Sequence, residues 1–291
     1  MITRLKLICV ALFWGGTFVA GRIVGPLLPP PVSAMARFVI ATALMAATAY
    51  VLEGGLPRLD RRLFGVTVLL GFLGIFAYNN FFFAAVQLLP ASRTALLVAL
   101  NPVATALLNA LLLRQPLAPL RWLGILISFL GASIVITHGD PTALAQGAIG
   151  RGEWIMLAGV VCWALYTILS QLILKTGLSP IAATTYASLW GSLLLMLYAI
   201  PSLGQVHWSG LGLDAALSVL YLGIPGTAIA YIWYFDGVKE LGAPRTAVFN
   251  NFVPVFGVLL SALLLHERVP PSTLLGGGIV LCGVALTSRG R

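Results

Sequence analysis

Apolar runs of about 20 residues recur along this chain, and most charged side chains lie in the short gaps between them. Only 9% of the 291 residues are charged and 59% are hydrophobic, whereas a water-soluble domain carries roughly a quarter charged residues. Because hydrocarbon offers the backbone no hydrogen-bond partner, such runs must be helices that bond internally. We therefore predict an all-α integral membrane protein.

We predict ten membrane-spanning helices, separated by short connections rich in proline and glycine. Their approximate ranges are 5–25, 32–52, 63–84, 92–113, 119–138, 153–173, 180–200, 212–235, 244–265 and 272–288. The first apolar run continues through Val24 without a small-residue cleavage site. It is therefore expected to be the first span rather than a secretory signal.

A duplicated stretch relates the two halves of the chain. Residues 91–119 and 243–271 are identical at 13 of 29 aligned positions, and both carry an Arg-Thr pair near the start and a proline near the middle. Each copy is thus expected to be an apolar helix interrupted by proline. We predict two domains, residues 1–138 and 153–291, joined by a comparatively polar linker at 139–152.

Each half holds five predicted spans, so the two copies must enter the membrane from opposite sides, as inverted repeats. The Lys and Arg residues indicate the orientation. With the N-terminus inside, twelve fall on the cytoplasmic side and three, Arg93, Arg151 and Arg268, on the other. We therefore predict that both termini are cytoplasmic. This placement accounts for the net charge of +9 without a nucleic-acid partner.

Signatures of catalysis and of metal binding are missing from the sequence. It has no HExxH, GxSxG or phosphate-loop pattern, and its histidines and cysteines show no ligand spacing. We predict no catalytic residue, no metal and no cofactor, so the protein is not expected to be an enzyme.

Polar residues within the fourth and ninth spans are more informative, since each costs free energy unless it faces protein or water. They follow one helical face in each span: Thr94, Asn101, Thr105 and Asn109 in the fourth, and Thr246, Asn250, Gly257 and Ser261 in the ninth. Two interpretations stay open. The faces could line a wet path between the halves, or they could only hold helices together.

Pro102 and Pro254 lie beside these polar faces. They leave the carbonyls of Val98 and Asn250 partly free, which lipid tolerates only where protein or cavity water satisfies them. Interruptions of this kind in transporters mark binding sites or hinges, and the alternative is a packing kink without function. We predict a hinge at each proline.

Aromatic and amide side chains lie where the walls of a cavity between the halves would be. Aromatic faces suit ligands with flat or apolar groups, and amides can hydrogen-bond a zwitterion. Arg37, inside the second span, could meet a carboxylate; the alternative is that it extends to the membrane surface. The predicted substrate-binding residues are Trp14, Arg37, Tyr78, Asn79, Asn101, Trp163, Tyr166, Tyr186, Asn250 and Asn251.

All eight carboxylates fall at span ends or in loops. Proton and sodium antiporters usually need a buried acid, so we predict that substrate movement is not obligatorily coupled through one. The fifth and tenth spans are rich in small residues. We predict that they pack outside the path, and that they could join two copies in a homodimer.

These features together resemble the drug/metabolite transporter superfamily. The ten spans and the prolines of spans 4 and 9 carry the resemblance, and Leu259–Glu267, LLSALLLHE, is similar to a signature of its EamA-domain exporters. Within that group the chain resembles the YddG-like aromatic amino-acid exporters. The resemblance implies a central cavity formed by spans 1–4 and 6–9. One departure is Gln115, where the second half has Glu267.

The resemblance implies export of amino acids or related metabolites across the inner membrane. We therefore expect a multi-pass protein of the cell inner (plasma) membrane that exports amino acids, aromatic ones included, by facilitative alternating access. Its partners would be the amino-acid substrate and the lipid bilayer. Multidrug or quaternary-ammonium efflux is the alternative, weakened by the lack of a mid-membrane acid. A non-transporting membrane scaffold is the third.

Overall fold

The computed structural model describes residues 2–112, 114, 117–140, 149–241, 246 and 248–289. Most of the predicted linker, 141–148, and Gln115 lie outside these residues. The described part of the chain is helical, without a strand. Eight of its helical segments are long and apolar enough to cross a membrane, and two shorter apolar helices follow at 249–264 and 271–287. The prediction of an all-helical, multi-span membrane protein is confirmed.

Each of the eight long and two shorter helical segments follows an apolar run of the sequence. Among the described residues, the third, fourth, eighth and ninth segments contain a local interruption. The bounds, in chain order, are α1 Ile2–Val24, α2 Pro30–Glu53, α3 Arg61–Leu70, η1 Gly71–Ala77, α4 Tyr78–Leu88, α5 Ala91–Val98, α6 Asn101–Leu112, α7 Pro119–Thr137, α9 Arg151–Leu174, α10 Pro180–Leu203, η2 Trp208–Gly210, α11 Leu213–Gly223, η3 Ile224–Ile229, α12 Ala230–Leu241, η4 Val248–Asn251, α14 Phe252–Leu264 and α15 Pro271–Arg289.

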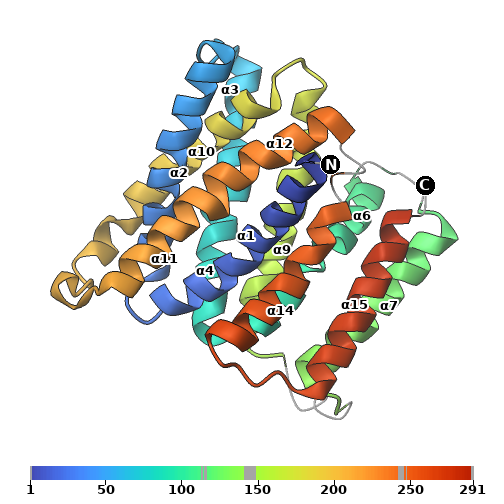
Figure 1. Cartoon of the computed structure of the whole chain (residues 1–291). Coiled ribbons are helices and arrows are strands. Elements are labelled where there is room, and N and C mark those ends of the chain that lie inside the picture. Colours follow the sequence, from blue (N-terminus) through green and yellow to red (C-terminus); the bar gives the residue numbers. More distant parts are fainter. Residues whose placement is uncertain are drawn as a thin grey trace.

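Helices from the first half of the chain pack on helices from the second half throughout the bundle. Helix α1 packs on α14 and α12, α2 on α10, and α4 on α9. Helices α7 and α15 form a closely packed pair at the edge of the molecule (Figure 1). Figure 1 also shows that α1 begins and α15 ends at the same end of the bundle.

The fourth and ninth spans are each interrupted just before the proline that the duplicated stretch carries. Helix α5 ends at Val98 and α6 begins at Asn101, so Pro102 is the second residue of the new helix. In the ninth span, the 3₁₀ turn η4 ends at Asn251, and Pro254 is the third residue of α14. Because proline has no N–H to donate, it is best tolerated in the first turn of a helix. The prediction of two proline-interrupted helices is confirmed.

The third and eighth spans contain a feature that the sequence analysis did not anticipate. Each widens mid-way into a π-helical segment, η1 in the third span and η3 in the eighth. A β-carbon at Gly74, within η1, would lie 2.6 Å from Cγ of Tyr166. The absence of a side chain therefore lets α9 approach the widened turn. π-Helical turns are rare and are frequent at functional sites.

Candidate functional site

A buried arginine lies between the two π-helical segments. Arg37 of α2 is 7% exposed. Its Nε donates a hydrogen bond to Oγ1 of Thr227 at 2.8 Å, its Nη1 to Oδ1 of Asn79 at 3.2 Å, and its Nη2 to the Gly226 carbonyl at 3.4 Å. All three acceptors are neutral. Arg37 therefore turns into the protein, not toward the membrane surface.

The two side chains that accept from Arg37 also satisfy carbonyls of the widened turns. Thr227 donates its hydroxyl to the Leu222 carbonyl at 2.8 Å. Asn79 donates its amide to the carbonyls of Ile75, at 2.9 Å, and Gly74, at 3.3 Å. A π-turn leaves carbonyls without their usual α-helical partner, and buried carbonyls need one. Arg37 thus connects η1 and η3: it bonds Thr227 of η3 directly, and it bonds Asn79 of α4, whose amide holds two carbonyls of η1.

Aromatic rings from four helices form a cluster beside this polar centre, where Tyr78 and Tyr231 lie close enough to interact electrostatically with Arg37. The rings of Tyr78 and Trp163 lie 4.8 Å apart, and those of Trp163 and Tyr166 lie 5.2 Å apart. On the other side, the ring of Trp14 lies 6.0 Å from that of Tyr231. Trp163 also packs against the small apolar cluster that contains Tyr231. The rings of α1, α4, α9 and α12 therefore form one connected aromatic cluster.

The predicted asparagines of the ninth span lie at the edge of this cluster. Asn250, in η4, is hydrogen-bonded through its side chain to Tyr234, whose ring lies 5.5 Å from that of Trp14. Asn251 precedes α14 without capping it. On the fourth span, Oδ1 of Asn101 is buried and has no partner among the described residues. Asn250 is therefore tied to the aromatic cluster, and Asn101 offers a free acceptor beside the helix break.

Tyr186 lies apart from the other predicted site residues. Its hydroxyl donates a hydrogen bond to the Pro57 carbonyl at 2.6 Å, in the connection before α3. The structure thus brings together Trp14, Arg37, Tyr78, Asn79, Trp163 and Tyr166, and it places Tyr186 at one end of the bundle.

The polar faces of spans 4 and 9 bond largely within their own helices. Thr94 donates to the Pro90 carbonyl at 3.0 Å, and Ser261 donates to the Val258 carbonyl at 3.0 Å. A β-carbon at Gly257 would lie 2.7 Å from Cβ of Ala95. These contacts fit the helix-packing interpretation, and the wet path stays a prediction.

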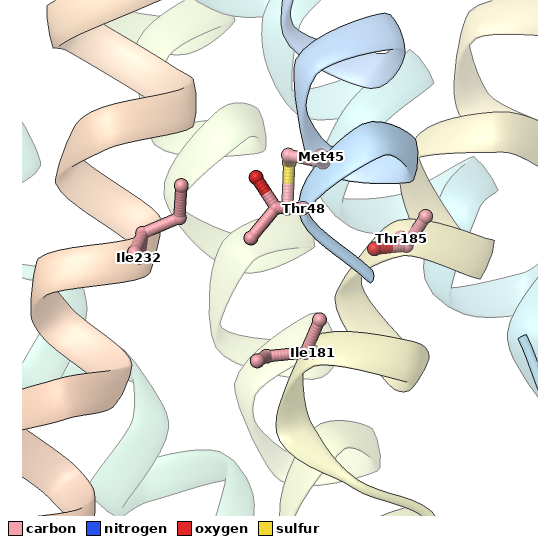
Figure 2. Close-up of a pocket in the computed structure, with 5 residues that line it drawn as sticks. All are labelled: Met45, Thr48, Ile181, Thr185 and Ile232. Carbon is pink, nitrogen blue, oxygen red and sulfur yellow. The ribbon is translucent and has the colours of Figure 1, made fainter. Parts of the chain in front are cut away.

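A small pocket opens between α2, α10 and α12, toward the Glu53 end of α2. Its volume is about 10 Å³, enough for about one water molecule. Figure 2 shows the five residues that line it, Met45, Thr48, Ile181, Thr185 and Ile232. The Thr185 hydroxyl is buried without a partner among the described residues, so a water would satisfy it. The pocket is too small for an amino acid and is not the substrate site.

The opposite end of the bundle is tied across the two halves. The Glu267 carboxylate, before α15, accepts from the backbone N–H groups of Ala91 and Ser92 at 2.8 and 3.1 Å. In the same turn, Arg93 pairs with Glu153 at 2.8 Å. These contacts fix the first turn of α5 against the second half of the chain.

Sequence reasoning missed Thr227 and Gly226. One signal was available: Pro225 stands in the middle of the eighth apolar run, where proline disturbs an α-helix. Among the described residues, no group of three or more His, Cys, Asp or Glu side chains could hold a metal ion.

Both halves of the chain match one family of known proteins. The model of the EamA-like transporter family matches residues 1–137 and again residues 150–289. The chain is 29% identical to the uncharacterized transporter YyaM of Bacillus subtilis (strain 168), over 98% of this chain and 93% of that one. It is 26% identical to a probable terminal-alkyne amino-acid exporter of Streptantibioticus cattleyicolor, over 88% and 82%.

The fold also has a counterpart among solved structures. One crystal structure superposes with a TM-score of 0.69 at 21% identity, covering 98% of this chain and 96% of that one. At this identity the likeness concerns the fold alone.

Proposed function

Since the chain belongs to the EamA-like transporter family, we propose that it is a facilitative exporter of amino acids, aromatic ones included, in the cell inner membrane. One relative carries the name of a probable amino-acid exporter, which supports this substrate class. Related small metabolites with the same charged groups would share the path.

The observation that carries the proposal is the aromatic cluster around a buried cation at the seam between the halves. Trp14, Arg37 and Tyr78 come from the first half of the chain, and Trp163 and Tyr166 from the second. An aromatic amino acid needs a flat apolar surface for its side chain and a cation for its carboxylate. The proposed site offers both in one place.

The remaining predicted residues have places in the same proposal. Asn79 would stand beside the carboxylate, and Asn101, Asn250 and Asn251 would supply amide contacts near the helix breaks. Tyr186 would meet substrate only near the end of the bundle, where its hydroxyl now bonds the Pro57 carbonyl.

Transport would proceed by rocking of two inverted five-helix repeats, residues 1–138 and 153–291, about the breaks at Pro102 and Pro254. The match of one family model to each half supports the repeat. So does the reciprocal packing, in which α10 contacts η1 and α3 while α2 contacts η3 and α11. Both termini would be cytoplasmic.

Pairing of two copies through α7 and α15 stays a prediction. The glycines of the two helices already face each other within one chain: a β-carbon at Gly131 would lie 2.6 Å from the Gly276 carbonyl. A homodimer would therefore use the outer faces of this pair, where Leu126, Phe129 and Leu274 are exposed.

Export from loaded vesicles tests the proposal. Proteoliposomes are loaded with phenylalanine, threonine or the lipophilic cation tetraphenylphosphonium, and release is compared with that from protein-free liposomes. The protein should accelerate phenylalanine release most and leave the rate for the cation unchanged. Acceleration of the cation alone would favour multidrug efflux, which the buried Arg37 opposes because like charges repel. No acceleration of either amino acid would remove the amino-acid proposal.

A further inference from the structure

Arg37 is a buried cation without a carboxylate partner. All eight acidic residues of the chain belong to the described part, and the ion pairs found there are Lys6–Asp236 and Arg93–Glu153. A guanidinium remains protonated in proteins, and burying a charge is costly unless it is paired. The site therefore holds one uncompensated positive charge, which a bound anion would neutralise.

Of the three hydrogen bonds that Arg37 donates, one is short and two are long. The bond from Nε to Thr227 is short, at 2.8 Å, whereas those from Nη1 to Asn79 and from Nη2 to the Gly226 carbonyl are 3.2 and 3.4 Å. Charge-assisted bonds to a carboxylate are typically about 2.7–2.9 Å. The two terminal nitrogens thus make only weak bonds to neutral oxygens. A carboxylate can replace those bonds and accept from both nitrogens at once.

Thr227 is suited to hold the guanidinium while this exchange occurs. It is fully buried, and its hydroxyl is fixed by donation to the Leu222 carbonyl. It can therefore accept only from a donor that lies on its other side, and Nε of Arg37 does so. Asn79 has a different role. Its amide oxygen accepts from Nη1 of Arg37, which is one of the two nitrogens that a bound carboxylate would bond.

We propose that Arg37 forms an obligatory carboxylate subsite, in which the carboxylate displaces Asn79 and the Gly226 carbonyl while Thr227 holds Nε in position. This inference rests on the proposed transport function and narrows its substrate class to compounds that carry a carboxylate. An amino group is not required by this subsite. Because Asn79 is bonded to η1 and Gly226 belongs to η3, loading the carboxylate also releases the connection between the two π-helical segments.

Three ligands that share an aromatic ring separate the two charged groups of an amino acid. They are phenylalanine, 3-phenylpropionate, which lacks the amino group, and phenethylamine, which lacks the carboxylate. Titration of the purified full-length protein in lipid nanodiscs, followed by tryptophan fluorescence and calorimetry, should show binding of the first two and none of the third. Equal binding of phenethylamine, or no binding of either carboxylate, would overturn the subsite.

Asn79→Asp is the decisive variant, because it places a fixed carboxylate beside Nη1 without changing the size of the side chain. The built-in anion should weaken 3-phenylpropionate binding about 10- to 100-fold, as expected for loss of a bidentate charged contact. The substitution also removes the amide donor to the Ile75 and Gly74 carbonyls, so the melting temperature does not by itself report the new ion pair. A purely structural role of Arg37 would leave binding unchanged. Asn80→Asp is the control, since the Asn80 amide bonds the Phe76 carbonyl instead of facing Arg37; it should keep the preference for carboxylates.

Two further variants complete the test. Arg37→Gln should abolish carboxylate binding, and Thr227→Val should weaken it without creating affinity for phenethylamine. The experiments distinguish failure of the transport proposal from failure of the carboxylate subsite. If vesicles do not export amino acids but Asn79→Asp still weakens 3-phenylpropionate binding, the subsite stands and the transport proposal fails. If vesicles export phenylalanine and Asn79→Asp binds 3-phenylpropionate as the natural protein does, the subsite is wrong.

Discussion

Nη2 of Arg93 lies 2.8 Å from Oε1 of Glu153, and this ion pair joins the first turn of α5 to the first turn of α9. The two side chains are 13% and 4% exposed. A second bond from Arg93 reaches the Ile136 carbonyl at 2.7 Å. Three helices of the two halves are therefore held together at this end of the bundle by one arginine.

Glu153→Gln should destabilise the protein, because it leaves the buried Arg93 charge without its partner. Breaking a buried pair in this way costs on the order of 3–5 kcal/mol, which differential scanning fluorimetry in detergent would register as a lower melting temperature. The double variant Arg93→Gln/Glu153→Gln should lose less than the sum of the two single losses. Strictly additive losses would show that the two residues are not coupled.

The exposed pair Lys6–Asp236 provides the control for this prediction. Its atoms are equally close, at 2.7 Å, but the side chains are 34% and 42% exposed. Exposed pairs contribute about 0–1 kcal/mol. Asp236→Asn should therefore leave the melting temperature almost unchanged.

Trp163→Ala should abolish export while leaving folded protein in the membrane. The substitution removes the ring that connects Tyr78 to Tyr166. Loss of a central aromatic contact costs on the order of tenfold or more in binding. The measurement is phenylalanine release from proteoliposomes, with membrane-inserted protein quantified in parallel.

Trp154→Ala is the matched control, since Trp154 belongs to the same helix and is 61% exposed. It should transport as the natural protein does. Normal transport by Trp163→Ala would remove the leading residue of the proposed site.

The sequence predicted the helices and the two proline breaks well because both depend on local chemistry. A single run of about 20 apolar residues in a bilayer must form a helix, because only a helix satisfies all its backbone hydrogen bonds within the run. Proline interrupts a helix whatever its surroundings are. Pro102 and Pro254 could therefore be placed at helix breaks without knowledge of the packing.

The π-helical segments could not be predicted in the same way. A widened turn adds one residue to a helical turn without changing the apolar character of the run. Its position depends on tertiary contacts such as the approach of Tyr166 to Gly74. For this reason Thr227 was missed. Arg37 and Asn79 belong to the same hydrogen-bonded group, and they were selected because they are polar residues inside apolar spans.

Tyr186 illustrates a different limit. Helix α10 carries Thr184, Ser188 and Ser192 at spacings of four, and this face is buried. Tyr186 does not share that face. It was selected because it is aromatic, but its hydroxyl bonds the Pro57 carbonyl at the end of the bundle. The rotation of a membrane helix is set by its neighbours, so aromatic character alone does not place a residue at the centre.

Gly283→Ala should separate α7 from α15. A β-carbon there would lie 2.5 Å from both the Gly124 carbonyl oxygen and the Ser128 nitrogen, which are backbone atoms that cannot move aside. Overpacking of this kind costs about 1–3 kcal/mol. The expected result is a lower melting temperature and faster proteolysis in detergent. Gly278→Ala in the same helix is the control, because nothing lies within 4 Å of its added β-carbon, and an equal loss in both variants would contradict this explanation.

Single cysteines should reveal the predicted orientation of the chain. Thr176 and Ser209 are exposed residues beyond the two ends of α10, so they should lie on opposite sides of the membrane. In a background without Cys9, Cys162 and Cys282, we expect Ser209→Cys to react with an impermeant maleimide on intact cells and Thr176→Cys to react only after permeabilisation. The reverse pattern would place both termini outside.

A pH gradient should have little effect on transport, because the chain offers no unpaired acid in the middle of the membrane. Glu153 is the most buried of the eight carboxylates. It lies in the first turn of α9 and is already paired with Arg93. Proton coupling needs a group that gains and loses its proton during the cycle, and transporters usually place such an acid in the membrane interior, where the sequence offers none. Phenylalanine release driven by its own gradient should therefore proceed at the same rate with and without an imposed pH step. A several-fold acceleration that disappears in Glu153→Gln would contradict this prediction and show that transport is coupled to protons through this carboxylate.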